Sequence, residues 1–130
     1  MKMLITNIEY ENNDIFITCK TTIGNLKGKW CDKLQLPILL ENYHCELIIR
    51  EIERTEVAIF TSGEPSVCYE NGMVAFTGVC EEIDDIYVVR FAGDWLEMVD
   101  VKNDDFMIKR GDVISFAIEY EGISIYPYEL

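Results

Sequence analysis

The chain has 130 residues, of which 49% are hydrophobic, and its 24 acidic and 11 basic residues give a formal net charge of -13 at pH 7. This length is typical of one domain, which we expect to span residues 1–130, and the hydrophobic content predicts a packed core rather than a disordered chain. Because a negative charge of this size repels phosphate backbones and anionic lipid and attracts basic surfaces, we expect no nucleic acid, no membrane and a basic protein partner.

Segments that would direct or cross-link the chain are missing from the sequence. No apolar run approaches the roughly 20 residues needed to cross a bilayer, and residues 1–12 lack the apolar stretch of a secretion signal. We therefore expect a cytoplasmic protein. The five cysteines are an odd number without a Cys-x-x-Cys pair, which argues against a disulfide framework or a zinc site and for reduced, mostly buried thiols.

The chain begins with two segments typical of strands. Residues 3–9 and 15–21 are alternating or β-branched runs, and residues 11–14 between them are Glu-Asn-Asn-Asp. This pattern predicts a hairpin with a four-residue loop. The glycine-containing residues 24–28 are expected to form a turn or a short irregular piece.

The middle of the chain has a less regular pattern. Pro37 interrupts residues 30–44, whose apolar residues fit no single period, so we expect a loop with at most one helical turn after the proline. Residues 45–52 fit a short amphipathic helix or a strand, and their β-branched content favours a strand in a hairpin with residues 57–61. Residues 62–65, Ser-Gly-Glu-Pro, mark a turn within one barrel or a boundary between half-domains.

A stronger hairpin signal follows at Asn71 and Gly72. These two residues tolerate the left-handed backbone of a type I′ turn, and such a turn places Tyr69 opposite Val74. Gly78 then interrupts the outgoing strand, for which a β-bulge or a close approach of another segment is the usual reason.

Residues 86–101 predict another hairpin, with Gly93 and Asp94 at its turn. A type II′ turn takes glycine first, and counting outward from such a turn pairs Arg90 with Glu97 on the adjoining strands. The opposite charges of this pair would support the register by roughly 0.2 to 1 kcal/mol.

Apolar residues occupy both faces of this hairpin. In the predicted register the core face carries Tyr87, Val89, Phe91, Leu96 and Met98. The second face carries Ile86, Val88, Trp95, Val99 and Val101. We expect the loop at residues 30–44 to cover part of the second face and to leave Trp95 nearer to solvent. The alternative is that a protein partner covers Trp95, because tryptophan and arginine are the residues most enriched at binding hot spots.

The last hairpin is predicted from residues 113–125, with a turn at Glu121 and Gly122 and one continuous apolar face. Pro127 cannot donate to a ladder, so the final strand is expected to end there or to lie on an edge. About ten short strands with little or no helix predict an all-β fold, either a small antiparallel β-barrel or a β-sandwich. The run GVCEEIDDIYVVRF, residues 78–91, resembles the strand pairs of small SH3-like and OB-like barrels.

Catalytic signatures are sparse in the sequence. The only histidine, His44, adjoins Cys45, but consecutive strand residues point to opposite faces, which disfavours a catalytic pair. No Gly-x-Ser-x-Gly motif, phosphate loop or dinucleotide fingerprint is present. A calcium site is an alternative use of the acidic turns, but solvated turns explain its candidate ligands more simply. Those candidates are Glu82, Asp84, Asp85, Asp104 and Asp105. We therefore expect no catalytic residue, no metal site and no cofactor.

The sequence thus predicts an acidic, non-catalytic protein-binding module, not an enzyme. Complementary charge would speed its association with a basic partner, as in the immunity proteins that neutralise nuclease toxins. The candidate partner-binding residues are Glu81, Glu82, Asp84, Asp85, Arg90, Asp94, Trp95 and Glu97. The alternatives are a β-barrel that binds or converts a small molecule of unknown identity, and a structural subunit of a homo-oligomer.

Overall fold

Strands form nearly all of the regular structure, which confirms the all-β prediction. The computed structural model describes residues 1–84 and 86–128. Its strands are β1 (Lys2–Glu11), β2 (Asp14–Thr21), β3 (Gly24–Trp30), β4 (Asn42–Ile49), β5 (Ile52–Glu53), β6 (Ala58–Phe60), β7 (Ser66–Glu70), β8 (Met73–Ile83), β9 (Tyr87–Ala92), β10 (Trp95–Val99), β11 (Val101–Lys102), β12 (Val113–Glu119) and β13 (Ile123–Tyr128). Two 3₁₀ turns complete the set, η1 (Arg54–Glu56) and η2 (Tyr120–Gly122). Within the described residues no helix is long and apolar enough to span a membrane.

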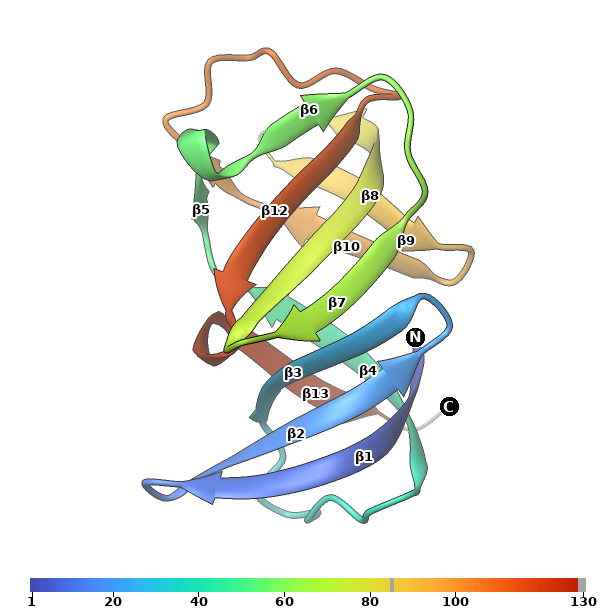
Figure 1. Ribbon diagram of the computed structural model, residues 1–130, viewed down its shortest axis with the longest axis vertical. Coiled ribbons are helices and arrows are strands. Elements are labelled where there is room, and N and C mark those ends of the chain that lie inside the picture. The colour runs from blue at the N-terminus through green and yellow to red at the C-terminus, as the bar shows by residue number, and fades with distance from the viewer. Residues whose placement is uncertain (85, 129–130) are drawn as a thin grey trace.

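Five of these strands close into a barrel, which forms the lower half of Figure 1. Around the barrel β1 pairs with β2, β2 with β3, β3 with β13, β13 with β4, and β4 with β1. All of these pairs are antiparallel except β3 with β13. The predicted small β-barrel is therefore confirmed, and the small OB-like barrels are likewise built from five strands. The run at residues 78–91 that resembles them lies outside it, in β8 and β9.

Residues 50–122 are inserted between β4 and β13 and form an upper lobe (Figure 1). One edge of the long strand β8 pairs with β12, while its other edge pairs first with β7 and then with β9. The change of partner occurs at Gly78, where a Cβ atom would lie 2.7 Å from Val89 and 2.8 Å from Phe91. The close approach predicted at this glycine is therefore confirmed, because only a residue without a side chain lets β9 pack there.

One cluster of buried apolar side chains runs through both lobes. Its members in the barrel include Ile5, Ile17, Cys19, Leu26 and Ile125. Its members in the upper lobe include Phe76, Phe91, Trp95, Ile114 and Ile118. Three of the five cysteines are buried, and all five are free thiols, as expected. The turn expected at residues 62–65 connects β6 to β7 inside the upper lobe.

A buried lysine lies at the junction between the lobes. Lys27 on β3 is only 4% exposed, and its ammonium lies 2.8 Å from the carboxylate of Glu9. The same ammonium lies 3.9 Å from the ring centre of Tyr120 and 5.5 Å from that of Tyr69. This cation holds the pKa of Glu9 below its ordinary value. Lys27 therefore links the barrel to β7 and η2 through charge and through the aromatic faces.

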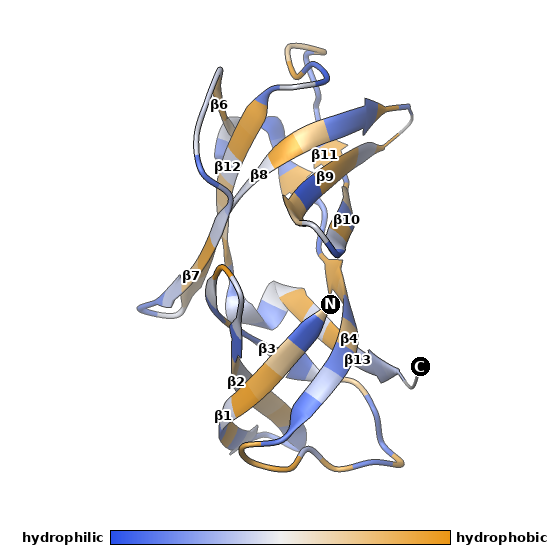
Figure 2. Ribbon diagram, turned by 90° about the vertical axis from the view of Figure 1, so that its right-hand side faces the viewer, coloured by the Kyte–Doolittle hydropathy of each residue, from blue (hydrophilic) through white to orange (hydrophobic). Residues whose placement is uncertain are grey.

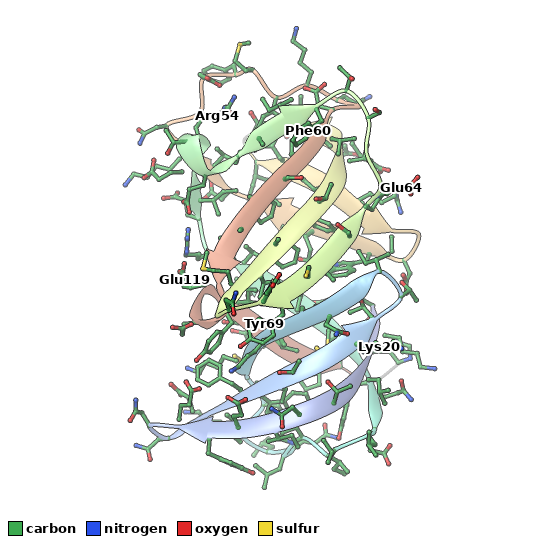
Figure 3. The ribbon with its side chains drawn as sticks, in the orientation of Figure 1. Lys20, Arg54, Phe60, Glu64, Tyr69 and Glu119 are labelled. Atoms are coloured by element: carbon green, nitrogen blue, oxygen red, sulfur yellow. The ribbon has the colours of Figure 1, made fainter. Side chains whose placement is uncertain are left out.

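Replacing Lys27 by alanine is expected to lower the free energy of unfolding by about 1 to 2 kcal/mol, because the change removes a buried aliphatic stem and the partner of Glu9. Urea denaturation followed by circular dichroism measures the loss. Lys20 on the neighbouring strand β2 is exposed (Figure 3), and its replacement by alanine should change stability by less than about 0.5 kcal/mol. Equal losses in the two variants would show that the junction does not depend on Lys27.

The first hairpin is tighter than predicted. Glu11 pairs with Asp14, and only Asn12 and Asn13 form the turn, with φ values of 49° and 75°. The expected four-residue loop is therefore wrong, because asparagine tolerates the left-handed conformation that a two-residue turn requires. Residues 24–28 are also not a turn, since they belong to β3 and pair with β2.

Two predicted hairpins have the right strands but the wrong partners. Residues 45–52 are indeed extended, yet β4 pairs with β1 and β13, while β6 pairs with β12. Residues 113–125 contain β12 and β13, but η2 carries the chain from the upper lobe into the barrel, so the two strands do not pair. In contrast, the type I′ turn at Asn71 and Gly72 is confirmed, with φ values of 51° and 79° and with Tyr69 opposite Val74.

Candidate functional site

The register of the β9–β10 hairpin determines which side chains reach its surface. Trp95 pairs with Ala92 as predicted. Beyond this pair a bulge shifts the register by one residue, so that Glu97 lies opposite Val89 and not opposite Arg90. The predicted pairing of Arg90 with Glu97 is therefore wrong. Gly93 lacks the positive φ that a type II′ turn requires, so the turn has a different geometry from the predicted one. The bulge that follows shifts the register by one residue and so changes which side chains lie opposite one another.

The shift also changes which residues of β10 are buried. Trp95 is 2% exposed and belongs to the core, so the expectation that it lies near solvent is wrong. Leu96 and Met98, which are predicted on the core face, are 47% and 66% exposed. The loop between β3 and β4 does not cover this hairpin, because it crosses the opposite end of the barrel (Figure 1).

Arg90 finds a different carboxylate. Its Nη2 lies 3.1 Å from Oε2 of Glu81 on the neighbouring strand β8, and its Nη1 donates to the carbonyl of Gly93 at 2.8 Å. The guanidinium holds the pKa of Glu81 below its ordinary value. Both side chains are partly exposed, so the pair orients Arg90 beside the turn more than it stabilises the fold.

A groove lies between β10 and residues 45–49 of β4, which do not pair with β1. Figure 2 shows β10 on the side of the upper lobe that faces the barrel. The groove consists of two hollows of about 370 and 380 Å³ that share Glu46, Leu96 and Glu97 as walls. The first hollow is also lined by Cys45, Arg90, Asp94, Trp95 and Tyr128. The second hollow is also lined by Ile48, Val88 and Met98. Carboxylates and aliphatic side chains therefore meet in one groove.

Glu97 is a partly buried acid of the groove. Its Oε1 accepts a hydrogen bond from the indole nitrogen of Trp95 at 3.0 Å. Burial raises the pKa of Glu97 to about 7, and the nearby Glu46 adds to this rise, while hydrogen bonds from Trp95 and the backbone of Leu47 oppose it. A carboxyl with this pKa gains or loses its proton near neutral pH, which is frequent at functional sites.

Four of the eight predicted partner-binding residues line this groove. They are Arg90, Asp94, Trp95 and Glu97, with Trp95 as part of the buried wall. Glu81 is held beside them through Arg90, whereas Glu82 and Asp84 are exposed and do not line the groove. Asp85 lies outside the described residues.

The sequence-based prediction missed Glu46, Ile48 and the exposure of Leu96 and Met98. The β-branched content of residues 45–52 favours a strand, but nothing in this segment indicates that β10 faces that strand. The exposure of Leu96 and Met98 follows from the bulge, which the Gly-Asp turn sequence does not reveal.

Other candidate chemistry is not assembled in the described residues. Cys45 is buried, and burial raises the pKa of its thiol to about 12, which leaves it protonated and poorly nucleophilic. Tyr87 donates its hydroxyl to Asp104, and Arg54 lies 2.8 Å from Asp105. No group of three or more metal-ligating side chains converges among residues 1–84 and 86–128.

The chain matches no family model, no curated protein and no solved structure. The chemistry of the groove itself is therefore the basis for a functional proposal.

Proposed function

We propose that the protein is a non-catalytic binding module that takes a basic, amphipathic segment of a partner protein into the groove between β4 and β10. The observation that supports this proposal best is the exposure of aliphatic side chains beside carboxylates in that groove. Ile48, Leu96 and Met98 are 59%, 47% and 66% exposed, and Glu46 and Glu97 lie beside them. A partner that covers the aliphatic side chains must also meet the carboxylates.

The distribution of charge favours a basic partner. Residues 50–122 contain 17 acidic and six basic residues, a net charge of -11, whereas the rest of the chain has seven acidic and five basic residues. The upper lobe therefore carries nearly all of the negative charge. Such a field speeds the approach of a basic surface and opposes the approach of an acidic one.

The groove offers different contacts to different parts of such a segment. A lysine or arginine side chain in the first hollow would meet Glu46, Asp94 and Glu97, and its charge would favour the ionised form of Glu97. Apolar side chains would rest on Ile48, Leu96 and Met98, where each fully buried aliphatic side chain contributes about 1.5 to 3 kcal/mol. Charge would set the approach, and apolar burial would hold the complex.

Synthetic peptides test this function directly. A ten-residue peptide of alternating lysine and leucine is expected to bind in isothermal titration calorimetry and to bind more weakly as salt rises. Two control peptides, one of alternating glutamate and leucine and one of alternating lysine and serine, should bind at least tenfold more weakly than the lysine–leucine peptide. The double variant L96S/M98S should weaken lysine–leucine binding by tenfold or more, because tenfold corresponds to only about 1.4 kcal/mol.

A matched control lies on the same lobe. Phe106 and Met107 are exposed apolar residues that do not line the groove, and the double variant F106S/M107S should bind the peptide as the unchanged protein does. Equal weakening in both double variants, or equal binding of the acidic peptide, would contradict the proposal.

A second candidate function is supported by a separate hollow of about 580 Å³ at the far end of the barrel. Its walls combine the aromatic residues Trp30 and Tyr126 with two lysines, Lys29 and Lys33, and two aspartates, Asp14 and Asp32. Lys29 pairs with Asp14 at 3.2 Å. The aromatic walls together with Lys33 suit a small ligand with an apolar body and an acidic group. Binding of such a ligand should change the fluorescence of Trp30 in the variant W95F, and a screen of aromatic acids that leaves it unchanged argues against this candidate.

A further inference from the structure

The loop between β3 and β4 presents the largest set of exposed aliphatic residues in the described part of the chain. It crosses the lower end of the barrel in Figure 1, and Figure 2 shows hydrophobic segments along it. Within the segment 34–40, which we name the aliphatic loop, Pro37 is buried, whereas five aliphatic residues are exposed, from 51% at Leu39 to complete exposure at Leu34. The exposed members are Leu34, Leu36, Ile38, Leu39 and Leu40.

The backbone of the aliphatic loop is fixed to the barrel. The carbonyl of Gln35 accepts the indole N–H of Trp30 at 2.7 Å, and the amide of Ile38 donates to the hydroxyl of Tyr43 at 3.1 Å. The amide of Leu40 donates to the carbonyl of Ile5 at 2.8 Å. These bonds hold the exposed side chains outward, so an interface there would lose little entropy on ordering.

Leu40 adopts a left-handed backbone conformation, with φ of 66°. This conformation is unfavourable for a residue as bulky as leucine. Residues held in such strained conformations cluster at functional sites, where the surrounding structure maintains the strain. Within the chain, no burial of the Leu40 side chain offsets the cost, since it is 69% exposed. The loop is therefore shaped to present this side chain and not to hide it.

We propose that two copies of this chain associate through their aliphatic loops, barrel end to barrel end. A twofold contact brings the same patch of both copies together, so the patch must complement itself. Aliphatic side chains satisfy this condition, and the flanking charges, Asp32, Lys33 and Glu41, are of both signs.

The uneven charge of the chain points to the same arrangement. The barrel with its loops has a net charge of only -2, whereas the upper lobe has -11. Contact through the barrel ends places the two upper lobes at opposite ends of the dimer, beyond the roughly 8 Å over which charges interact at physiological salt. Any contact through the upper lobes would bring like charges together.

Sedimentation velocity at protein concentrations from about 1 to about 200 µM tests the proposal on the unchanged protein. We expect a monomer–dimer equilibrium that changes little between about 50 and about 500 mM salt, and a dimer whose maximum dimension in small-angle scattering is nearly twice that of the monomer. The double variant L34S/L39S should raise the dissociation constant at least thirtyfold. The variant F106S/M107S, altered at exposed residues of the upper lobe, should dimerise as before.

Cross-linking gives a second readout that does not depend on serine substitutions. In a background that carries Cys68→Ser, because Cys68 is exposed, the variant L39C should form a covalent dimer on mild oxidation, whereas F106C should not. A monomer at about 200 µM, a dimer unaffected by L34S/L39S, or equal cross-linking through both positions would overturn the proposal. Co-sedimentation of the monomer with phosphatidylcholine vesicles that L34S/L39S abolishes would also overturn it, because the loop would then bind lipid.

This inference is independent of the proposed groove function, because neither β4 beyond His44 nor β10 is part of the aliphatic loop. Peptide binding with a strictly monomeric protein would remove only the dimer. A dimer without peptide binding would remove only the groove function.

Discussion

Replacing Gly24 by alanine is expected to lower the free energy of unfolding by about 3 kcal/mol or more. Gly24 begins β3 with φ of 141°, and a Cβ atom there would lie 1.8 Å from the carbonyl oxygen of Val67. The obstacle is backbone, which cannot rotate away as a side chain can, and the conformation is one that other residues rarely adopt. Because β7 joins β3 at this contact, the change should disturb the junction of the two lobes. Urea denaturation followed by circular dichroism measures it.

Alanine substitutions at two other glycines distinguish the cost of the steric clash from the cost of the positive φ. Gly72 has φ of 79°, and a Cβ atom there would meet no other atom within 4 Å, so alanine should cost only about 1 to 2 kcal/mol. Gly93 has neither the positive φ nor a close neighbour, and alanine there should change stability by less than about 0.5 kcal/mol. If alanine costs the same at Gly24 and Gly72, the contact with Val67 is not the reason.

Replacing Glu97 by glutamine is expected to stabilise the protein by about 2 to 3 kcal/mol at pH 8 and to have no such effect below about pH 4.5. Burial raises the pKa of Glu97 from an ordinary value of 4.5 to about 7. Below the lower value both the folded and the unfolded chain hold the proton, so the shift changes nothing. As pH rises through this window the unfolded chain loses its proton first, and the folded state loses stability relative to it. Glutamine has no proton to lose and still accepts the bond from Trp95.

The pH range in which stability changes distinguishes the effect of Glu97 from that of the carboxylates that pair with Arg50. Arg50 lowers the pKa of Glu56 and of Glu119, and the stability that those pairs contribute is lost only as the solution becomes more acidic than their ordinary pKa of 4.5. Denaturation curves of wild type and E97Q between about pH 4 and pH 8.5 should therefore diverge steadily toward high pH. Curves that stay parallel would show that Glu97 is solvated. The exposed carboxylate variant E51Q is the control and should run parallel to wild type.

Local signals in the sequence were enough to locate most strands. The pair Asn71 and Gly72 specified both a turn and its register, because few residues tolerate two successive left-handed conformations. Gly78 indicated a close approach, because a glycine inside a strand leaves room for a neighbouring segment to pack against the backbone. Alternation along residues 113–119 and 123–125 likewise indicated strands, but alternation states which face is buried and not which strand lies alongside. The partners of β4, β12 and β13 depend on contacts far apart in the chain.

The candidate site shows the same limit on a smaller scale. A Gly-Asp turn is compatible with more than one loop geometry, and the one that forms adds a bulge after Trp95. That single residue separated Arg90 from Glu97 and exposed Leu96. Four predicted residues still line the groove, because they belong to one hairpin and stay close to one another whichever register the hairpin adopts. Glu46 and Ile48 could not be added from the sequence, because the facing of β4 by β10 has no local signature.

The position of β13 has a consequence for how the chain is made. This strand lies between β3 and β4, yet residues 123–128 leave the ribosome after all of the other described strands. Until then, β3 and β4 each expose backbone amides and carbonyls that have no partner, and such open edges recruit other nascent chains. The prompt arrival of these six residues should therefore govern the yield of soluble protein during synthesis.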